Sequence, residues 1–218
     1  MKRTWIAGAA ALAALAATPA LADSHFGLGV KAGTLGLGVE GNWAPLPLID
    51  FRFGVNTFDY DDDRQRAGID YDAELYLQSL YATANFKVPA SPLRLTAGAF
   101  SNGNELRLVS VGAASYDIGG DTFTAAEVGT IRSKTSFDSM APYLGVGFDF
   151  SAFGKVGVNL DFGVLWQGDP DVSLRADGLL AGDPDFQAAL DSERQELLDD
   201  IDDFKAWPVV SLGFFYNF

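Results

Sequence analysis

Apolar residues alternate with smaller or more polar ones through PVVSLGFFYNF, the stretch that closes the chain at Phe218. One parity is apolar throughout, and the other contains serine, glycine and asparagine with one phenylalanine. Successive side chains of a β-strand point to opposite faces, so this period of two predicts a strand with one apolar face.

The same alternation recurs upstream. In VGVNLDFGVLWQ one set of alternate positions is apolar, and the other set contains glycine, asparagine and aspartate. The other candidate strands are HFGLGVKAG, LGLGVEGNW, IDFRFGVN, the segment that ends in LYATANFKV, LRLTAGAFS and APYLGVGFDF. The pattern therefore predicts eight strands, and no apolar run after residue 22 has the roughly 20 residues that a membrane helix needs.

The connections between these strands fall into two classes. Tight turns are expected at APLP, PASP and SAFG, and longer acidic connections at 61–70, 102–136 and 167–205, with one short connection near Gly33 and Thr34. Short turns at one end and long loops at the other are typical of a bacterial outer-membrane barrel. We therefore expect an all-β fold, an eight-stranded antiparallel transmembrane β-barrel of a Gram-negative outer membrane, with both termini in the periplasm.

A soluble sandwich or lipocalin-like barrel is the main alternative. It would turn the apolar parity inward and leave the polar parity in water. The minor parity here is rich in glycine, which suits a narrow interior better than a solvated face. Aromatic residues also concentrate near the predicted strand ends, as in an interfacial girdle: Trp43, Phe86, Phe150, Phe214, Tyr216 and Phe218 toward the turns, and Trp166 toward the loops.

The first 22 residues have the composition of a secretory signal peptide. Lys2 and Arg3 precede an alanine-rich apolar run that ends at Ala20-Leu21-Ala22. A membrane-anchoring helix is the alternative, but the run is short and Pro19 interrupts it. We expect cleavage after Ala22, which leaves residues 23–218 as the barrel domain.

Charge and cysteine content exclude some partners and some modes of stabilisation. Without Lys2 and Arg3 the chain has 13 Lys and Arg against 29 Asp and Glu, so the formal net charge changes from −14 to −16. Such a chain is not expected to bind nucleic acid. It has no cysteine, so an exported fold must be stabilised without disulfides.

The long connection at 167–205 contains the clearest helix pattern. Asp183 is a plausible N-cap, Pro184 suits the first helical position, and an apolar stripe follows. The sequence therefore predicts a helix in the last extracellular loop. Two roles remain open: a lid over the barrel mouth, or a helix that orders the neighbouring loops.

Several of these stretches resemble the CarO family of Gram-negative outer-membrane proteins. The resemblance rests on GTLGLGVEGNWAP, APYLGVGFDF, GKVGVNLDFGVLWQGDPDVSL and an acidic helix that leads into DFKAWPVVSLGFFYNF. It implies an eight-stranded barrel that takes up ornithine or other basic amino acids. The segment from Asn102 to Ser136 has no match in that pattern.

Placing the minor parity inside the barrel puts several charged residues in the lumen. Those that could determine selectivity are Lys31, Glu40, Arg52, Arg94 and Asp161, accompanied by Asp50 and Asp149. Glu40 and Arg52 are expected to be cross-strand neighbours on either side of APLP. Such a pair could select or gate solutes, or it could belong to a polar plug, since eight strands leave an interior just wide enough for side chains. Inward glycines could leave a narrow path, or room for large side chains to lie flat.

The acidic loops predict a negative field at the outer mouth, which would concentrate small cationic solutes. The other expected partners are outer-membrane lipid and lipopolysaccharide, and the barrel-insertion machinery, which would read the strand ending at Phe218.

The aspartates between 59 and 70 resemble a calcium loop, but Arg64 replaces its turn glycine. His25 is the only histidine and is placed at the periplasmic entrance. We therefore expect no catalytic residue, metal or cofactor. The alternative to a narrow channel is a closed structural or surface-interaction barrel whose loops carry the function.

Overall fold

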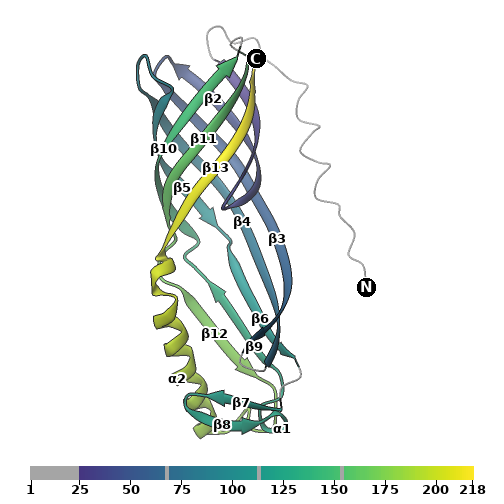
Figure 1. Ribbon diagram of the computed structural model, residues 1–218. Helices are drawn as coiled ribbons and strands as arrows, with labels where there is room; N and C mark the ends of the chain where they lie inside the picture. The colour runs from purple at the N-terminus through teal and green to yellow at the C-terminus, as the bar shows by residue number, and fades with distance from the viewer. Residues whose placement is uncertain (1–24, 67–68, 112–113, 153–154) are drawn as a thin grey trace.

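The computed structural model describes residues 25–66, 69–111, 114–152 and 155–218. Eight of its strands close into an antiparallel barrel in the order β1-β2-β3-β4-β5-β10-β11-β13, and β13 pairs back with β1 (Figure 1). These strands are β1 His25–Gly33, β2 Gly36–Leu46, β3 Ile49–Arg66, β4 Ile69–Lys87, β5 Leu93–Asn102, β10 Met140–Ala152, β11 Val156–Trp166 and β13 Ala206–Asn217. The eight-stranded barrel predicted from the sequence is confirmed, whereas the expected signal peptide at 1–22 lies outside the described residues.

The two ends of the barrel differ in the way that the connection lengths predicted. The turn end contains the tight β2–β3 and β4–β5 connections and Phe218, and the loop end contains α2 (Figure 1). The short turn near Gly33 and Thr34 is confirmed between β1 and β2. The SAFG turn falls partly on residues 153–154, which lie outside the described residues.

The β2–β3 register differs from the expected one. Glu40 lies opposite Gly54, and Arg52 lies opposite Asn42, so the two charged residues are not directly paired. The physical reason is that the turn is centred beyond APLP, with Leu46 opposite Ile49, and the register shifts between Trp43 and Leu46. Both residues keep their inward parity, because the offset is an even number of positions.

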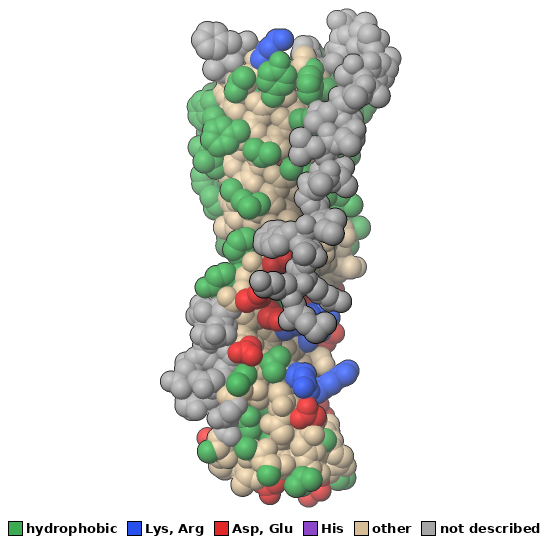
Figure 2. Space-filling view, turned by 90° about the vertical axis from the view of Figure 1, so that its right-hand side faces the viewer, with side chains coloured by type: hydrophobic (Ala, Val, Ile, Leu, Met, Phe, Trp, Pro, Cys, Tyr) green, Lys and Arg blue, Asp and Glu red, His purple; other side chains and the backbone are tan. Residues whose placement is uncertain are grey.

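The outward parity of the barrel is apolar, as predicted. Exposed apolar side chains form a broad belt over the barrel half of the molecule (Figure 2). The expected girdle residues are all exposed: Trp43, Phe86, Phe150, Trp166, Phe214, Tyr216 and Phe218. An apolar outer face with a polar interior is the pattern of a membrane barrel and the reverse of a soluble one.

The apolar face changes sides on β3 and β4 near the loop end. On β3, Phe53 and Val55 point outward. Phe58 and Tyr60 lie on the other face of the strand, the face on which Asn56 points into the barrel. On β4, Leu80 is exposed and Leu77 is buried on the opposite parity. The inversion marks where the sheet leaves the apolar belt, since beyond that level the water-facing side must be polar.

Beyond that level β4 continues into a folded module at the loop end, which we call the loop module. Its strands are β6 Glu105–Val111, β9 Ile131–Ser136 and β12 Asp171–Ala176, which pair in sequence onto β4, and the separate hairpin β7 Ser115–Ile118 and β8 Asp121–Thr124. Its helices are α1 Ala125–Val128, α2 Pro184–Asp200 and the 3-10 turn Asp202–Lys205. Neither α1 nor α2 is long and apolar enough to cross a membrane.

Two of the segments that were expected to be loops contain β-strands instead. Residues 61–66 and 69–70 belong to the extended β3–β4 hairpin, because their backbones pair up to Arg66 opposite Ile69. The connection at 102–136 contains strands that extend the sheet and bury apolar residues with α2. Long-range pairing thus orders segments whose acidic composition suggested loops.

The predicted helix is confirmed as α2. Asp183 is its N-cap and accepts hydrogen bonds from the backbone N–H groups of Asp185 and Phe186, and Pro184 is at its start. Its buried residues, including Phe186 and Leu190, pack with β7, β8, β9 and β12 in one apolar cluster. These contacts are those of a helix that orders its neighbours, the second of the two roles considered.

Asp177 fixes the start of β9, and this contact should depend on pH. One carboxylate oxygen accepts from the backbone N–H of Thr130 and the other from Arg132, each at 2.7 Å. The Thr130 hydrogen bond, and then Arg132, hold the pKa of Asp177 below its ordinary value. A depressed pKa stabilises the fold above the ordinary value of about 3.9, and this contribution is lost as pH falls through the folded-state pKa.

We expect acid to open this contact locally. Amide hydrogen exchange at Thr130, compared between the wild type and Asp177→Asn, should differ at neutral pH and converge as the pH falls below the folded-state pKa of Asp177. A difference that persists unchanged in acid would show that the carboxylate charge does not hold this strand end.

Candidate functional site

The lumen contains a charged layer centred on Arg52. Its guanidinium donates to Glu40 at 3.2 Å and to both oxygens of Asp149 at 3.0 and 3.1 Å. Its Nε lies 3.5 Å from Asp50, and Asp50 is also 3.1 Å from Lys87. Arg52 therefore connects residues from β2, β3 and β10 across the barrel interior.

Arg94 is the second centre of the layer. Its Nε donates to Asp149 at 3.1 Å, and its terminal nitrogens donate to Asp161, to Asn85 at 3.1 Å and to Thr96 at 2.9 Å. Its side chain is 2% exposed. Asp149 thus bridges the two guanidinium groups, which links the two sides of the lumen through charge-assisted hydrogen bonds.

Lys31 and Tyr81 complete the layer on the side of Glu40. Lys31 lies 3.6 Å from Glu40 and 3.9 Å from the centre of the Tyr81 ring. The Tyr81 hydroxyl donates to Glu40 at 2.6 Å. The carboxylate of Glu40 is therefore held by three different side chains, with Arg52 as the third.

The charges of this layer are balanced among the described residues. The basic members are Lys31, Arg52, Lys87 and Arg94, and the acidic members are Glu40, Asp50, Asp149 and Asp161. A buried charge is costly unless it is paired and hydrogen-bonded. This arrangement is the one expected of a polar plug, and it leaves little net charge to select a solute.

Inward glycines provide room for large side chains. A Cβ atom on Gly147 would lie 2.5 Å from Cζ of Arg94, and one on Gly157 would collide with the ring of Phe215. Glycines therefore allow these side chains to lie flat against the barrel wall. Of the two roles considered for them, the structure supports packing.

The remaining space in the lumen is small at the centre and wider at the turn end. The central cavity, between Arg52, Arg94 and Phe100, measures about 30 Å³. A buried water molecule needs roughly 10–15 Å³ of such cavity volume, so the central cavity has room for about two water molecules. A cavity of about 220 Å³ lies at the turn end and is lined by Asp50, Lys87, Asp149 and the side chain of Arg52.

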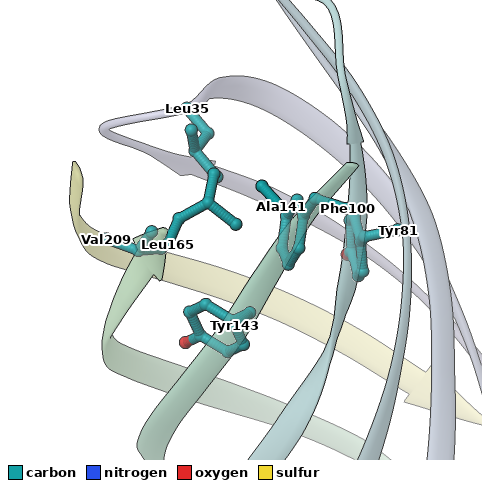
Figure 3. Packing of buried hydrophobic residues seen from close by; sticks show 7 residues of the cluster. All are labelled: Leu35, Tyr81, Phe100, Ala141, Tyr143, Leu165 and Val209. Carbon is teal, nitrogen blue, oxygen red and sulfur yellow. The ribbon is translucent and has the colours of Figure 1, made fainter. Parts of the chain in front are cut away.

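An apolar layer closes the lumen on the loop side of the charges (Figure 3). Phe100 is stacked on Tyr81, with ring centres 4.8 Å apart, and lies 5.3 Å from Tyr143. Leu35 from the β1–β2 turn points into the same layer and is 6% exposed. Its neighbours in the cluster are Ala141, Leu165 and Val209.

Hydrogen bonds hold the turn that carries Leu35. The Thr34 hydroxyl donates to the carbonyl of Pro208 at 2.9 Å and accepts from the N–H of Val210 at 3.1 Å. Gly36 has φ +94, a conformation that favours glycine and allows the turn to close. Leu35 is therefore fixed in the barrel mouth by contacts of its turn with β13.

An amide cluster lies beside this apolar layer at the mouth. The fully buried side chain of Gln167 accepts from Asn102 and Asn104 at 3.5 and 3.4 Å and donates to the carbonyl of Phe204 at 3.0 Å. These contacts connect the loop-side ends of β5 and β11 with the 3-10 turn that follows α2. Charged, apolar and amide groups thus fill the lumen in succession.

All five residues predicted to line the lumen lie in the charged layer. Lys31, Glu40, Arg52, Arg94 and Asp161 form one continuous network through Asp149. Tyr81 and Leu35 are further residues of the lumen that were not among those predicted from the sequence. Tyr81 shares the inward parity of Asn85, whereas Leu35 lies in a turn, where parity gives no signal.

The sequence matches no protein-family model and no curated protein. The solved structures that are similar to it include two from Acinetobacter baumannii. CarO2 aligns with a TM-score of 0.62 and 25% identity over 89% of this chain and 98% of that one. CarO aligns with a TM-score of 0.59 and 26% identity over 88% of this chain and 97% of that one.

Proposed function

We propose that this chain, a CarO-type outer-membrane barrel by its similarity to CarO2 and CarO, acts as a closed barrel that holds the loop module at the cell surface, with the module as its working part. In this proposal the turn end faces the periplasm, and the apolar belt contacts outer-membrane lipid. The barrel anchors and orients the module, and neither the charged layer nor the loops carry out catalysis.

One observation carries the proposal: the lumen is filled. Between the 220 Å³ cavity at the turn end and the loop module lie two small cavities, of about 30 Å³ and about 10 Å³. The charged layer on one side and the Phe100 and Leu35 layer on the other surround the larger of the two. A solute the size of an amino acid could pass only if both layers moved.

A second candidate function is a gated route for small cationic solutes such as basic amino acids. The turn-end cavity favours it, since Asp50 and Asp149 line a space large enough for a small solute. The acidic loops would add a negative field at the other end. Such a route would require a conformation in which Arg52 and the apolar layer separate.

Uptake by lipid vesicles distinguishes the two functions. Purified protein is reconstituted in phospholipid vesicles, and labelled lysine and glutamate are supplied outside. The closed barrel predicts that both enter at the rate of empty vesicles. Faster uptake of lysine than of glutamate, weakened in Asp161→Asn, would support the gated route and contradict the proposal.

Deleting Phe218 should reduce the amount of folded protein in the outer membrane. The Phe218 N–H donates to the carbonyl of Phe26 at 2.9 Å, and its ring packs edge-on against Tyr216. We expect the barrel-insertion machinery to read this last strand. The measurement is the heat-modifiable band in outer-membrane fractions, with Phe218→Tyr as the control that keeps an aromatic end. Equal yields of wild type and deletion would count against recognition through this residue.

A further inference from the structure

The two edges of the sheet in the loop module differ. At one edge, α2 packs along β12. At the other edge, β2 pairs with β3 only as far as Leu37 opposite Thr57, while β3 continues to Arg66. Within the described residues, no strand pairs with this side of β3 beyond Thr57. An uncovered edge presents backbone N–H and C=O groups that can pair with another strand.

The side chains along this free edge alternate in character. Phe58 and Tyr60 are 41% and 46% exposed, and their rings are stacked with centres 6.3 Å apart. Asp59 and Asp61 are exposed on the opposite face. The edge therefore offers an aromatic surface on one side and carboxylates on the other.

The carboxylates restrict what can pair with this edge. Edge charges discourage pairing with neutral strands, and like charges placed opposite each other are destabilising. A second copy of β3 would bring its own aspartates against Asp59 and Asp61. A strand with Lys or Arg at alternate positions would instead place opposite charges there, and its apolar residues would lie on Phe58 and Tyr60.

We propose that the free edge of β3, at residues 58–61, binds an extended cationic peptide by strand addition. The peptide backbone pairs with β3, its basic side chains contact Asp59 and Asp61, and its apolar side chains cover Phe58 and Tyr60. The proposal rests on the proposed function in taking the loop module as the working part of the molecule. It assigns that module a ligand class: peptides in which basic and apolar residues alternate.

The test is binding of synthetic peptides to the full-length protein in nonionic detergent, followed by fluorescence anisotropy. The probe is a dye-labelled peptide of alternating lysine and valine. One comparison peptide has the same composition with the lysines and valines in separate blocks, and another has alternate backbone amides methylated. Strand addition predicts that both comparison peptides bind at least about tenfold more weakly, because alternation and backbone pairing are both lost.

Matched protein variants separate the edge from the general acidity of the chain. Asp59→Asn with Asp61→Asn should weaken binding about tenfold, since two ion pairs are lost. The control, Asp199→Asn with Asp200→Asn on exposed α2 positions, removes the same charge elsewhere and should leave affinity nearly unchanged. Phe58→Ser with Tyr60→Ser should also weaken binding. The unboiled gel mobility of each variant verifies that the barrel is folded.

Equal binding of the alternating and block peptides, or equal loss in the two aspartate variants, would show diffuse charge attraction and overturn the proposal. The protein could also form dimers without peptide that dissociate when Asp59→Lys is introduced. Such dimers would show that the edge pairs with a second copy of the chain, and they would overturn the proposal as well. None of these measurements involves solute passage. A negative result in the peptide experiments would therefore not contradict the closed barrel. Solute uptake by the vesicles would likewise not contradict the peptide site.

Discussion

Replacing Arg94 with alanine is expected to lower the free energy of unfolding by about 3–5 kcal/mol, the usual cost of removing one partner from a buried ion pair. Arg94 is almost fully buried and donates to Asp149 and Asp161. Its removal leaves Asp161 with only a 3.4 Å contact from Ser211 among the described hydrogen bonds. The measurement is urea unfolding in detergent or lipid, followed by tryptophan fluorescence and unboiled gel mobility.

Two further variants test whether lost charge compensation causes this effect. Arg107→Ala removes an exposed guanidinium that pairs with Glu105 in the loop module, and it should leave the unfolding midpoint unchanged. Arg94→Ala combined with Asp161→Ala should recover part of the loss, because the unpaired carboxylate is gone. If Arg94→Ala unfolds at the same urea concentration as Arg107→Ala, the charged layer is not a stabilising plug.

Replacing Phe100 with alanine is expected to cost about 3–5 kcal/mol, since a buried ring is removed and a cavity remains. Phe100 is 3% exposed and lies between Tyr81 and Tyr143. The variant should still be closed to solutes, because the charged layer lies next to the new space. Urea unfolding measures the first effect, and vesicle uptake measures the second.

The matched control is Leu95→Ala on the same strand, β5. Leu95 is exposed on the lipid-facing parity, so detergent or lipid can fill the space that its side chain leaves. We expect a smaller loss of stability than for Phe100→Ala. Equal losses at the two positions would mean that the apolar layer does not pack as a core.

The barrel could be predicted from sequence because each membrane strand has two sharply different faces. In β11 and β13 the lipid face must be apolar, and the narrow interior favours glycine and polar groups. The same rule placed Arg94 and Asp161 inside before any contact was known. Their connection through Asp149 could not be predicted, because it depends on the register of strands that are distant in sequence.

The loop module was less predictable for physical reasons. Aspartate is depleted in strands, so the acidic stretch after Tyr60 suggested a loop, but pairing with β4 keeps it extended. β6, β9 and β12 pair with one another in the sheet, and apolar residues of β9 and β12 pack in the cluster that contains α2. The position of Leu35 likewise depends on a turn that the hydroxyl of Thr34 holds against β13.

Electrical recording across a planar lipid bilayer tests most directly whether the resting barrel is closed. Purified wild-type protein is inserted at high potassium chloride concentration, and current is recorded at moderate voltages of both signs. The filled lumen predicts the current of a bare bilayer, with no discrete steps. Insertion is verified by protease accessibility of the loop module. Reproducible unitary steps from the inserted wild-type protein would contradict the closed barrel and would make the lumen, instead of the loop module, the site of function.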